Sequence, residues 1–124
     1  MNAKEKSILL VDDDKAILRT FSRILQRAGF STETAETGKE ALEKIHAKNY
    51  DITLIDVILG DSNGLDLLPH IRDISPKTVK IIMTGADSLQ RKTEACKNGA
   101  DVYLTKPVSP ETLLNIFQQK LKCT

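Results

Sequence analysis

At 124 residues, with 40% hydrophobic and 28% charged residues, the chain is long and apolar enough to form one soluble globular domain without disulfides or a structural metal. Its net charge of +1 gives no electrostatic argument for binding nucleic acid, which usually requires a clustered basic surface. No window approaches the roughly 20 apolar residues of a membrane helix, and the charged N-terminus lacks a signal-peptide core, so we expect a cytoplasmic protein.

Short apolar runs alternate with amphipathic segments along the whole chain, a pattern typical of βαβ units in a parallel sheet. The second run is more polar than the others, with Ser31 and Glu33 in alternation, so we expect it at a sheet edge. The pattern therefore predicts a three-layer α/β domain. Its predicted strands are residues 8–11, 30–35, 51–55, 79–83 and 102–104.

Helix-start and helix-stop residues flank the amphipathic segments. Asp14 is a favourable N-cap for the first helix, and Gly29 a favourable C′ residue. Thr37 and Glu40 form a capping box before the second helix, and Ser109 suits the N-cap of the last. We expect the third helix at residues 65–74 and the fourth from Asp87 or Ser88 to Asn98.

Polar residues follow four of the predicted strands at their carboxyl ends. Asp12 and Asp13 follow the first strand, Asp56 the third, Thr84 the fourth and Lys106 the fifth. In open parallel sheets, ligand chemistry lies at the carboxyl ends of the strands. We therefore expect these five side chains to form one site.

The residue types at these strand ends point to a divalent metal and a phosphoryl group. Three carboxylates repel one another when buried together unless a cation joins them. Their hard oxygen donors favour Mg²⁺ or Mn²⁺, so Asp12, Asp13 and Asp56 predict a metal site. Asp56 can also act as a nucleophile toward phosphorus, with the metal, Lys106 and the Thr84 hydroxyl balancing the phosphoryl oxygens.

Together these motifs resemble the receiver domain of two-component response regulators, the CheY-like superfamily, from Ile8 to about Leu121. The resemblance implies a flavodoxin-like (βα)5 doubly wound parallel sheet with strand order 2-1-3-4-5. It also implies a single receiver domain over residues 1–124, with its core at about 7–122. The motifs that carry it are Asp12-Asp13-Asp14, Asp56 with Gly64 eight residues later, Thr84-Gly85 and Lys106-Pro107.

By this resemblance, Asp56 would accept a phosphoryl group from a sensor histidine kinase or a phosphotransfer protein. Asp13 and Asp56 would bind Mg²⁺ directly, with the backbone carbonyl of Ile58 as a further ligand and Asp12 acting largely through water. The protein would then be a signalling switch rather than an enzyme, because it would catalyse only its own phosphorylation and slow dephosphorylation.

The resemblance also implies how phosphorylation is transmitted. Thr84 would bond the phosphoryl group, and Tyr103 would rotate into the space it leaves, which would alter the surface of the fourth helix, fifth strand and fifth helix. The Lys106–Pro107 bond would be cis. An output domain or downstream protein would read the altered surface, and a phosphorylation-dependent homodimer is one such outcome.

The loop after Asp56 departs from the family pattern. Leu59-Gly60 replaces the frequent Met-Pro pair, and the glycine predicts a more pliable loop. Water that hydrolyses the acyl phosphate would pass between Ile58 and Ala86, neither of which can orient it by a hydrogen bond. We therefore expect slow self-dephosphorylation.

Three other classes of protein remain as alternatives. A haloacid-dehalogenase-type phosphatase usually has an Asp-x-Asp motif, and residue 58 is isoleucine. A flavodoxin-like cofactor binder would not place three acids where phosphate binds. A phosphorylation-independent docking module would not need the complete acid, hydroxyl and lysine set. We expect no metal role for His46 or His70, and reduced thiols at Cys96 and Cys123.

Overall fold

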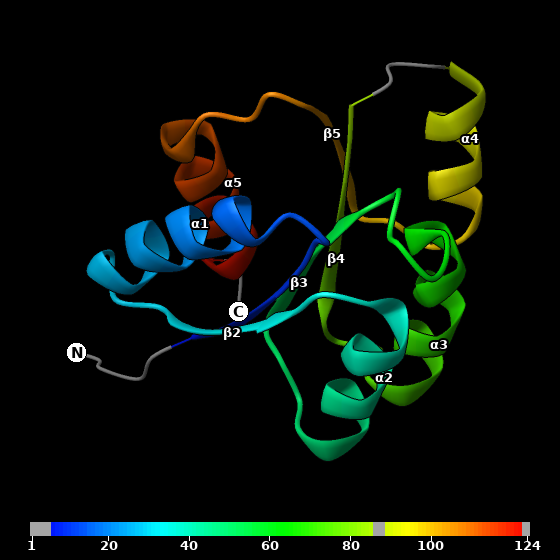
Figure 1. The fold of residues 1–124 in the computed structure, drawn as a ribbon, viewed down its shortest axis with the longest axis horizontal. Helices are drawn as coiled ribbons and strands as arrows, with labels where there is room; N and C mark the ends of the chain where they lie inside the picture. The colour runs from blue at the N-terminus through cyan, green and yellow to red at the C-terminus, as the bar shows by residue number, and fades with distance from the viewer. Residues whose placement is uncertain (1–5, 86–88, 123–124) are drawn as a thin grey trace.

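The computed structural model describes residues 6–85 and 89–122, which form a five-stranded parallel sheet in the order β2-β1-β3-β4-β5 (Figure 1). This topology confirms the predicted doubly wound α/β fold, with the polar strand β2 at an edge. The strands are β1 (Ser7–Val11), β2 (Ser31–Ala35), β3 (Ile52–Asp56), β4 (Val79–Thr84) and β5 (Val102–Thr105). The helices are α1 (Lys15–Arg27), α2 (Gly38–Ala47), η1 (Gly64–Asp66, a 3-10 turn), α3 (Leu67–Ile74), α4 (Leu89–Lys97) and α5 (Pro110–Lys122).

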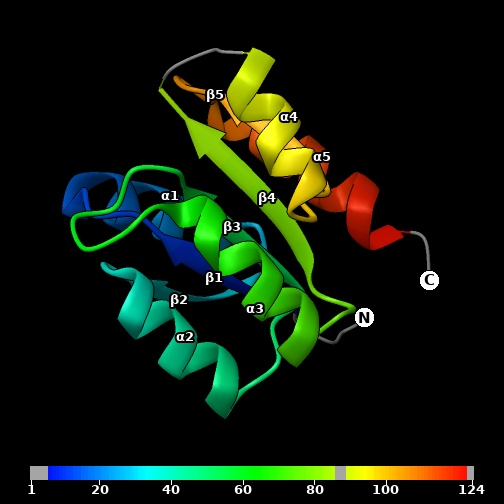
Figure 2. The same ribbon diagram turned by 90° about the vertical axis from the view of Figure 1, so that its right-hand side faces the viewer.

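Helices cover both faces of the sheet. Helices α1 and α5 lie on one face, and α2, α3 and α4 lie on the other (Figures 1 and 2). Alternate residues of each central strand enter two separate cores, so Leu10 packs toward α1 and α5 while Leu9 packs toward α2 and α3. Every residue of β3 is buried. The central strand can therefore hold its terminal carboxylate, Asp56, in a fixed position.

The strand register brings the four predicted strand ends to one edge of the sheet. Val11 pairs with Ile55, which places Asp12 beside Asp56. Asp56 pairs with Met83, the residue before Thr84. At the next strand, the amide of Lys106 donates to the Thr84 carbonyl oxygen at 2.7 Å. The five polar side chains thus start from adjacent backbone positions.

The third helix begins two residues later than predicted. Residues 64–66 form the turn η1, in which the Asn63 side chain accepts a hydrogen bond from the Leu65 amide at 2.8 Å. An α-helix that began at Leu65 would need an N–H at Pro69, which proline lacks. Starting at Leu67 places Pro69 in the first turn, where a missing donor costs little.

The predicted helix caps are largely confirmed. The Asp14 carboxylate accepts bonds from the first turn of α1, Gly29 has φ of +100°, and Ser109 Oγ accepts a bond from the amide of Thr112. Of the two hydrogen bonds of the capping box predicted for α2, one is formed as expected. Its Thr37 hydroxyl accepts from the Glu40 amide, but the Glu40 carboxylate accepts from the amide at position 36 instead of position 37. The predicted start of α4 at Asp87 or Ser88 lies outside the described residues. Among the helices described, none has the length and hydrophobicity needed to cross a membrane.

Candidate functional site

Three carboxylates meet at the carboxyl edge of the sheet. Asp12 and Asp56 are buried, with 2% and 6% of their surface exposed, whereas Asp13 is exposed. One carboxylate oxygen from each residue lies within 4.8 Å of the other two. Two ligands of one Mg²⁺ are at most about 4.2 Å apart, so small side-chain rotations suffice for all three to reach a common ion. The donor set therefore fits the predicted divalent metal.

Lys106 supplies a positive charge to this cluster. Its Nζ atom lies 3.1 Å from Oδ2 of Asp56 and 3.4 Å from Oδ2 of Asp12. Burial lowers the pKa of Lys106, but the hydrogen bond with Asp56 and the charges of both carboxylates outweigh burial, and the net pKa is raised. The side chain remains an ammonium group in contact with two acids. The peptide bond between Lys106 and Pro107 is cis, the isomer that the resemblance implied.

Asp12 has the least solvated carboxylate of the three. Its Oδ1 atom accepts a hydrogen bond from the Asp14 amide at 2.9 Å, which favours the charged form. Burial nevertheless raises the pKa of Asp12, and the neighbouring charge of Asp56 raises it further. The carboxylates thus carry an unfavourable charge that a divalent cation would relieve.

The Asp56 carboxylate is held by a neighbouring backbone amide as well as by Lys106. Its Oδ1 atom accepts a long hydrogen bond, 3.4 Å, from the amide of Ile58. A β-carbon added at Gly64 would lie 2.1 Å from the backbone oxygen of Asp56, so the chain passes there only because residue 64 lacks a side chain. The glycine eight residues after Asp56 therefore has a direct steric role at the site.

Two further predicted residues lie on the neighbouring strands. Thr84 is fully buried at the end of β4. Tyr103 is half-buried on β5 and packs against the hydrophobic core beneath α2 and α3. The strand register pairs Tyr103 with Ile82, two residues before Thr84, so the Thr84 and Tyr103 side chains lie on the same face of the sheet. Ala86, the predicted partner of Ile58 in dephosphorylation, lies outside the described residues.

The loop after Asp56 contains two features that the sequence did not indicate. Ile58 is 59% exposed, and among the described residues it is the large hydrophobic side chain that solvent reaches most. Asp61 accepts hydrogen bonds from the first two amides of α2, from Gly38 at 2.9 Å and from Lys39 at 3.3 Å. This contact joins positions 22 and 23 residues apart, so no local pattern could have predicted it.

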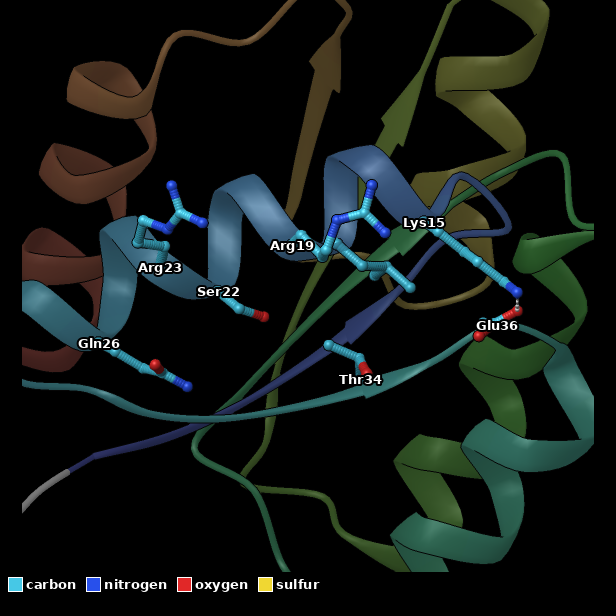
Figure 3. A pocket seen from close by; sticks show the side chains of 8 residues that line it. Lys15, Arg19, Ser22, Arg23, Gln26, Thr34 and Glu36 are labelled. Carbon is cyan, nitrogen blue, oxygen red and sulfur yellow. Dashed lines mark ion pairs between the residues drawn. The ribbon is translucent and has the colours of Figure 1, made fainter.

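Two grooves open near α1. One, of about 460 Å³ and mostly apolar walls, adjoins the acid site and is lined by Ile17, Phe21, Met83, Gly85, Lys106, Pro107 and Val108. The other, of about 470 Å³, lies between α1 and β2 (Figure 3), and Asp12, Asp13 and Asp56 are not among its lining residues. Its cations project from α1, and Lys15 reaches Glu36 at 4.0 Å. His46, His70 and Cys96 are exposed, and none of them lines either groove; Cys123 is not among the described residues.

This fold, with an acid cluster and a lysine at the carboxyl ends of its strands, defines the receiver class of signalling domain. The family model for the response regulator receiver domain matches residues 8–118. The chain belongs to this family.

Relatives and solved structures agree with this assignment. The chain is 38% identical over 110 residues to the alginate biosynthesis transcriptional regulatory protein AlgB of Pseudomonas aeruginosa, covering 89% of this chain and 24% of AlgB. It is 36% identical over 116 residues to the acid tolerance regulatory protein ActR of Sinorhizobium medicae, covering 94% and 60%. A CheY-like receiver domain protein from Methanospirillum hungatei superposes with a TM-score of 0.93 at 39% identity, covering 96% of this chain and 95% of that one. The chain thus spans a quarter to three fifths of the two curated relatives.

Proposed function

We propose that Asp56 is the phosphoacceptor of this receiver domain and that its donor is a phosphohistidine on a sensor kinase or phosphotransfer protein. The observation that carries the proposal is the ammonium group of Lys106, which lies within 3.4 Å of both Asp12 and Asp56 at a three-carboxylate cluster. Phosphorylation on aspartate is typical of the family. One solved relative, a response regulator from Burkholderia pseudomallei at 29% identity, contains a phosphorylated aspartic acid and a calcium ion.

The proposed reaction is an in-line transfer. A carboxylate oxygen of Asp56 attacks phosphorus, the bond from phosphorus to the histidine nitrogen breaks, and that nitrogen keeps the electron pair and takes up a proton. Lys106 holds Asp56 and would contact a phosphoryl oxygen, and Thr84 would bond another. Asp13, Asp56 and the Ile58 carbonyl would hold Mg²⁺ or Mn²⁺, with Asp12 acting largely through water. When bound, the metal would neutralise charge on the phosphoryl oxygens.

The direct test is phosphorylation of the 124-residue chain by acetyl phosphate with Mg²⁺. We expect mass spectrometry to show one added phosphoryl group at Asp56 and none in an Asp56→Asn variant, whose amide is a poor nucleophile. A chain that stays unmodified under these conditions would instead support the phosphorylation-independent docking module.

We also propose that phosphorylation alters the surface of α4, β5 and α5 through Thr84 and Tyr103, and that an output domain or partner reads this surface. The NtrC4 receiver domain, 33% identical to this chain, was solved as a beryllofluoride-activated dimer. Sedimentation with and without beryllofluoride and Mg²⁺ tests whether this chain dimerises in the same way. A species that stays monomeric would leave the output to another partner.

The phosphorylated state is proposed to be long-lived because the side chain at position 58 cannot bond water. Ile58 is exposed beside Asp56, so its side chain can shield the acyl phosphate from solvent. We expect Ile58→Asn to accelerate the loss of phosphate from Asp56, measured by intact mass after the donor is removed. Fast decay in the unmodified chain, unchanged by Ile58→Asn, would contradict the proposal.

A further inference from the structure

The loop from Val57 to Asn63 borders the acid cluster at two points. The Ile58 amide lies 3.4 Å from Oδ1 of Asp56. Gly60 is close to the third acid, since a β-carbon added there would lie 3.9 Å from Oδ2 of Asp13. A change in the position of this loop would therefore change the backbone next to two of the three carboxylates.

Several hydrogen bonds close the loop on itself. Ile58 forms an isolated bridge with Asn63, the Leu59 amide donates to the Ser62 carbonyl oxygen at 3.1 Å, and the Gly64 amide donates to the Val57 carbonyl oxygen. These bonds give the loop a hairpin-like shape. The start of the loop is anchored, because the Val57 amide donates to the Met83 carbonyl oxygen at 3.0 Å and the Val57 and Leu59 side chains are buried in the core. Residues 60–62 are exposed, so the tip of the loop is the part that needs a further restraint.

Asp61 provides a bond from this loop to a distant element. Its two carboxylate oxygens accept from the amides of Gly38 and Lys39, which lie in the first turn of α2 and so have no carbonyl partner within the helix. The hydrogen bond from Gly38 is the main reason that the pKa of Asp61 is lowered. The approach is close, because a β-carbon at Gly38 would lie 2.4 Å from Oγ of Ser62.

We propose that Asp61 is a positioning residue for metal binding, which tethers the loop to the N-terminus of α2 and thereby holds the Ile58 backbone beside Asp56. This inference rests on the metal site proposed above. It also explains how the chain tolerates Gly60 in this loop, since the tether would restrain a segment that glycine makes pliable. Residues that orient the ligands of a metal without binding it themselves commonly change the metal affinity by about ten-fold or more when they are mutated.

The test is the affinity of the full chain for Mg²⁺ alone, measured by isothermal titration calorimetry. We expect Asp61→Ala to weaken binding about ten-fold, and Asp61→Asn to restore part of the loss because it keeps one oxygen acceptor. Phosphorylation by acetyl phosphate should need more Mg²⁺ in Asp61→Ala but reach the unmodified rate at saturating Mg²⁺.

Thr37→Ala is the matched control. It removes the N-cap of the same helix, where Thr37 Oγ1 accepts from the Glu40 amide at 3.0 Å, and leaves the loop contact in place. We expect its Mg²⁺ affinity to equal that of the unmodified chain. The tether alone would be overturned if Asp61→Ala bound Mg²⁺ as tightly as the unmodified chain does. It would also be overturned if Thr37→Ala weakened Mg²⁺ binding as much as Asp61→Ala does. Absence of Mg²⁺ binding in the unmodified chain would overturn the metal site and the tether with it.

Discussion

Negative charge predominates at the acid site and positive charge in the groove between α1 and β2, but the two regions hold their charges differently. At the acid site two of three carboxylates are buried and share one ammonium group. In the groove, Lys15 is 69% exposed with a single ion pair at 4.0 Å, and Arg19 is exposed (Figure 3). Burying like charges is unfavourable, whereas a solvated basic helix face costs little. Burial and bonding of the charges therefore identify the functional site here, and the size of the groove does not.

The largest expected difference comes from removing one cation from each region. Lys106→Met should slow phosphorylation by acetyl phosphate about 100-fold, the effect typical of removing one group that stabilises the transition-state charge. Arg19→Met should leave the rate unchanged, because Arg19 lies in the groove and forms no ion pair among the described residues. Rates followed by intact mass check both. A comparable loss in the two variants would remove the distinction between the regions.

The next effect concerns two glycines beside the acids, Gly60 in the loop after Asp56 and Gly64 at the start of η1. Gly64→Ala should lower the free energy of unfolding by about 1–3 kcal/mol, because its β-carbon would lie 2.1 Å from the backbone oxygen of Asp56. Gly60→Ala meets only Oδ2 of Asp13 at 3.9 Å, so we expect little loss, or a gain of about 0.4–1 kcal/mol from the unfolded state. Urea denaturation of both variants measures the difference. Equal stability of the two would show that the backbone at Asp56 can move.

A smaller effect is expected at Asp12, whose acid form is favoured by burial. Since its pKa is raised in the folded state, the metal-free protein binds more protons than the unfolded chain between the two pKa values. Stability should therefore fall as pH rises through the folded pKa of Asp12. Asp12→Asn should raise stability at neutral pH by about 0.5–2 kcal/mol and lose this advantage in acid.

The matched variant is Glu36→Gln in the groove between α1 and β2. Glu36 is 49% exposed, so its loss should change stability by less than about 0.5 kcal/mol. Denaturation curves at several pH values without divalent metal check both variants. An Asp12→Asn protein less stable than the unmodified chain at neutral pH would mean that its bonds to Lys106 and to the Asp14 amide outweigh the burial of its charge.

The fold and the strand ends of the site were predictable because their signals are local. An apolar run that ends in aspartate places Asp56 without knowledge of the rest of the chain, and Asp14 and Gly29 mark the ends of their helix by conformational preference. The tether of Asp61 to Gly38 was not predictable, because it depends on how two loops meet in space. The steric role of Gly64 became clear only from the backbone oxygen it faces. The start of α3 was predicted two residues too early, because Pro69 lacks the N–H that a helix beginning at Leu65 would need.

A small effect is also expected at Ser22, which lines the groove between α1 and β2. Its Oγ atom is buried and has no hydrogen-bond partner among the described residues. Removing an unpaired buried hydroxyl eliminates a desolvation penalty without breaking a bond. Ser22→Ala should therefore leave stability unchanged or raise it by less than about 1 kcal/mol, with no change in phosphorylation, as measured by urea denaturation and intact mass. A clear loss of stability would mean that Ser22 has a partner within its own helix. A phosphorylation rate that falls would mean instead that the groove takes part in the chemistry, and the contrast between a bonded acid site and a solvated basic groove would then fail.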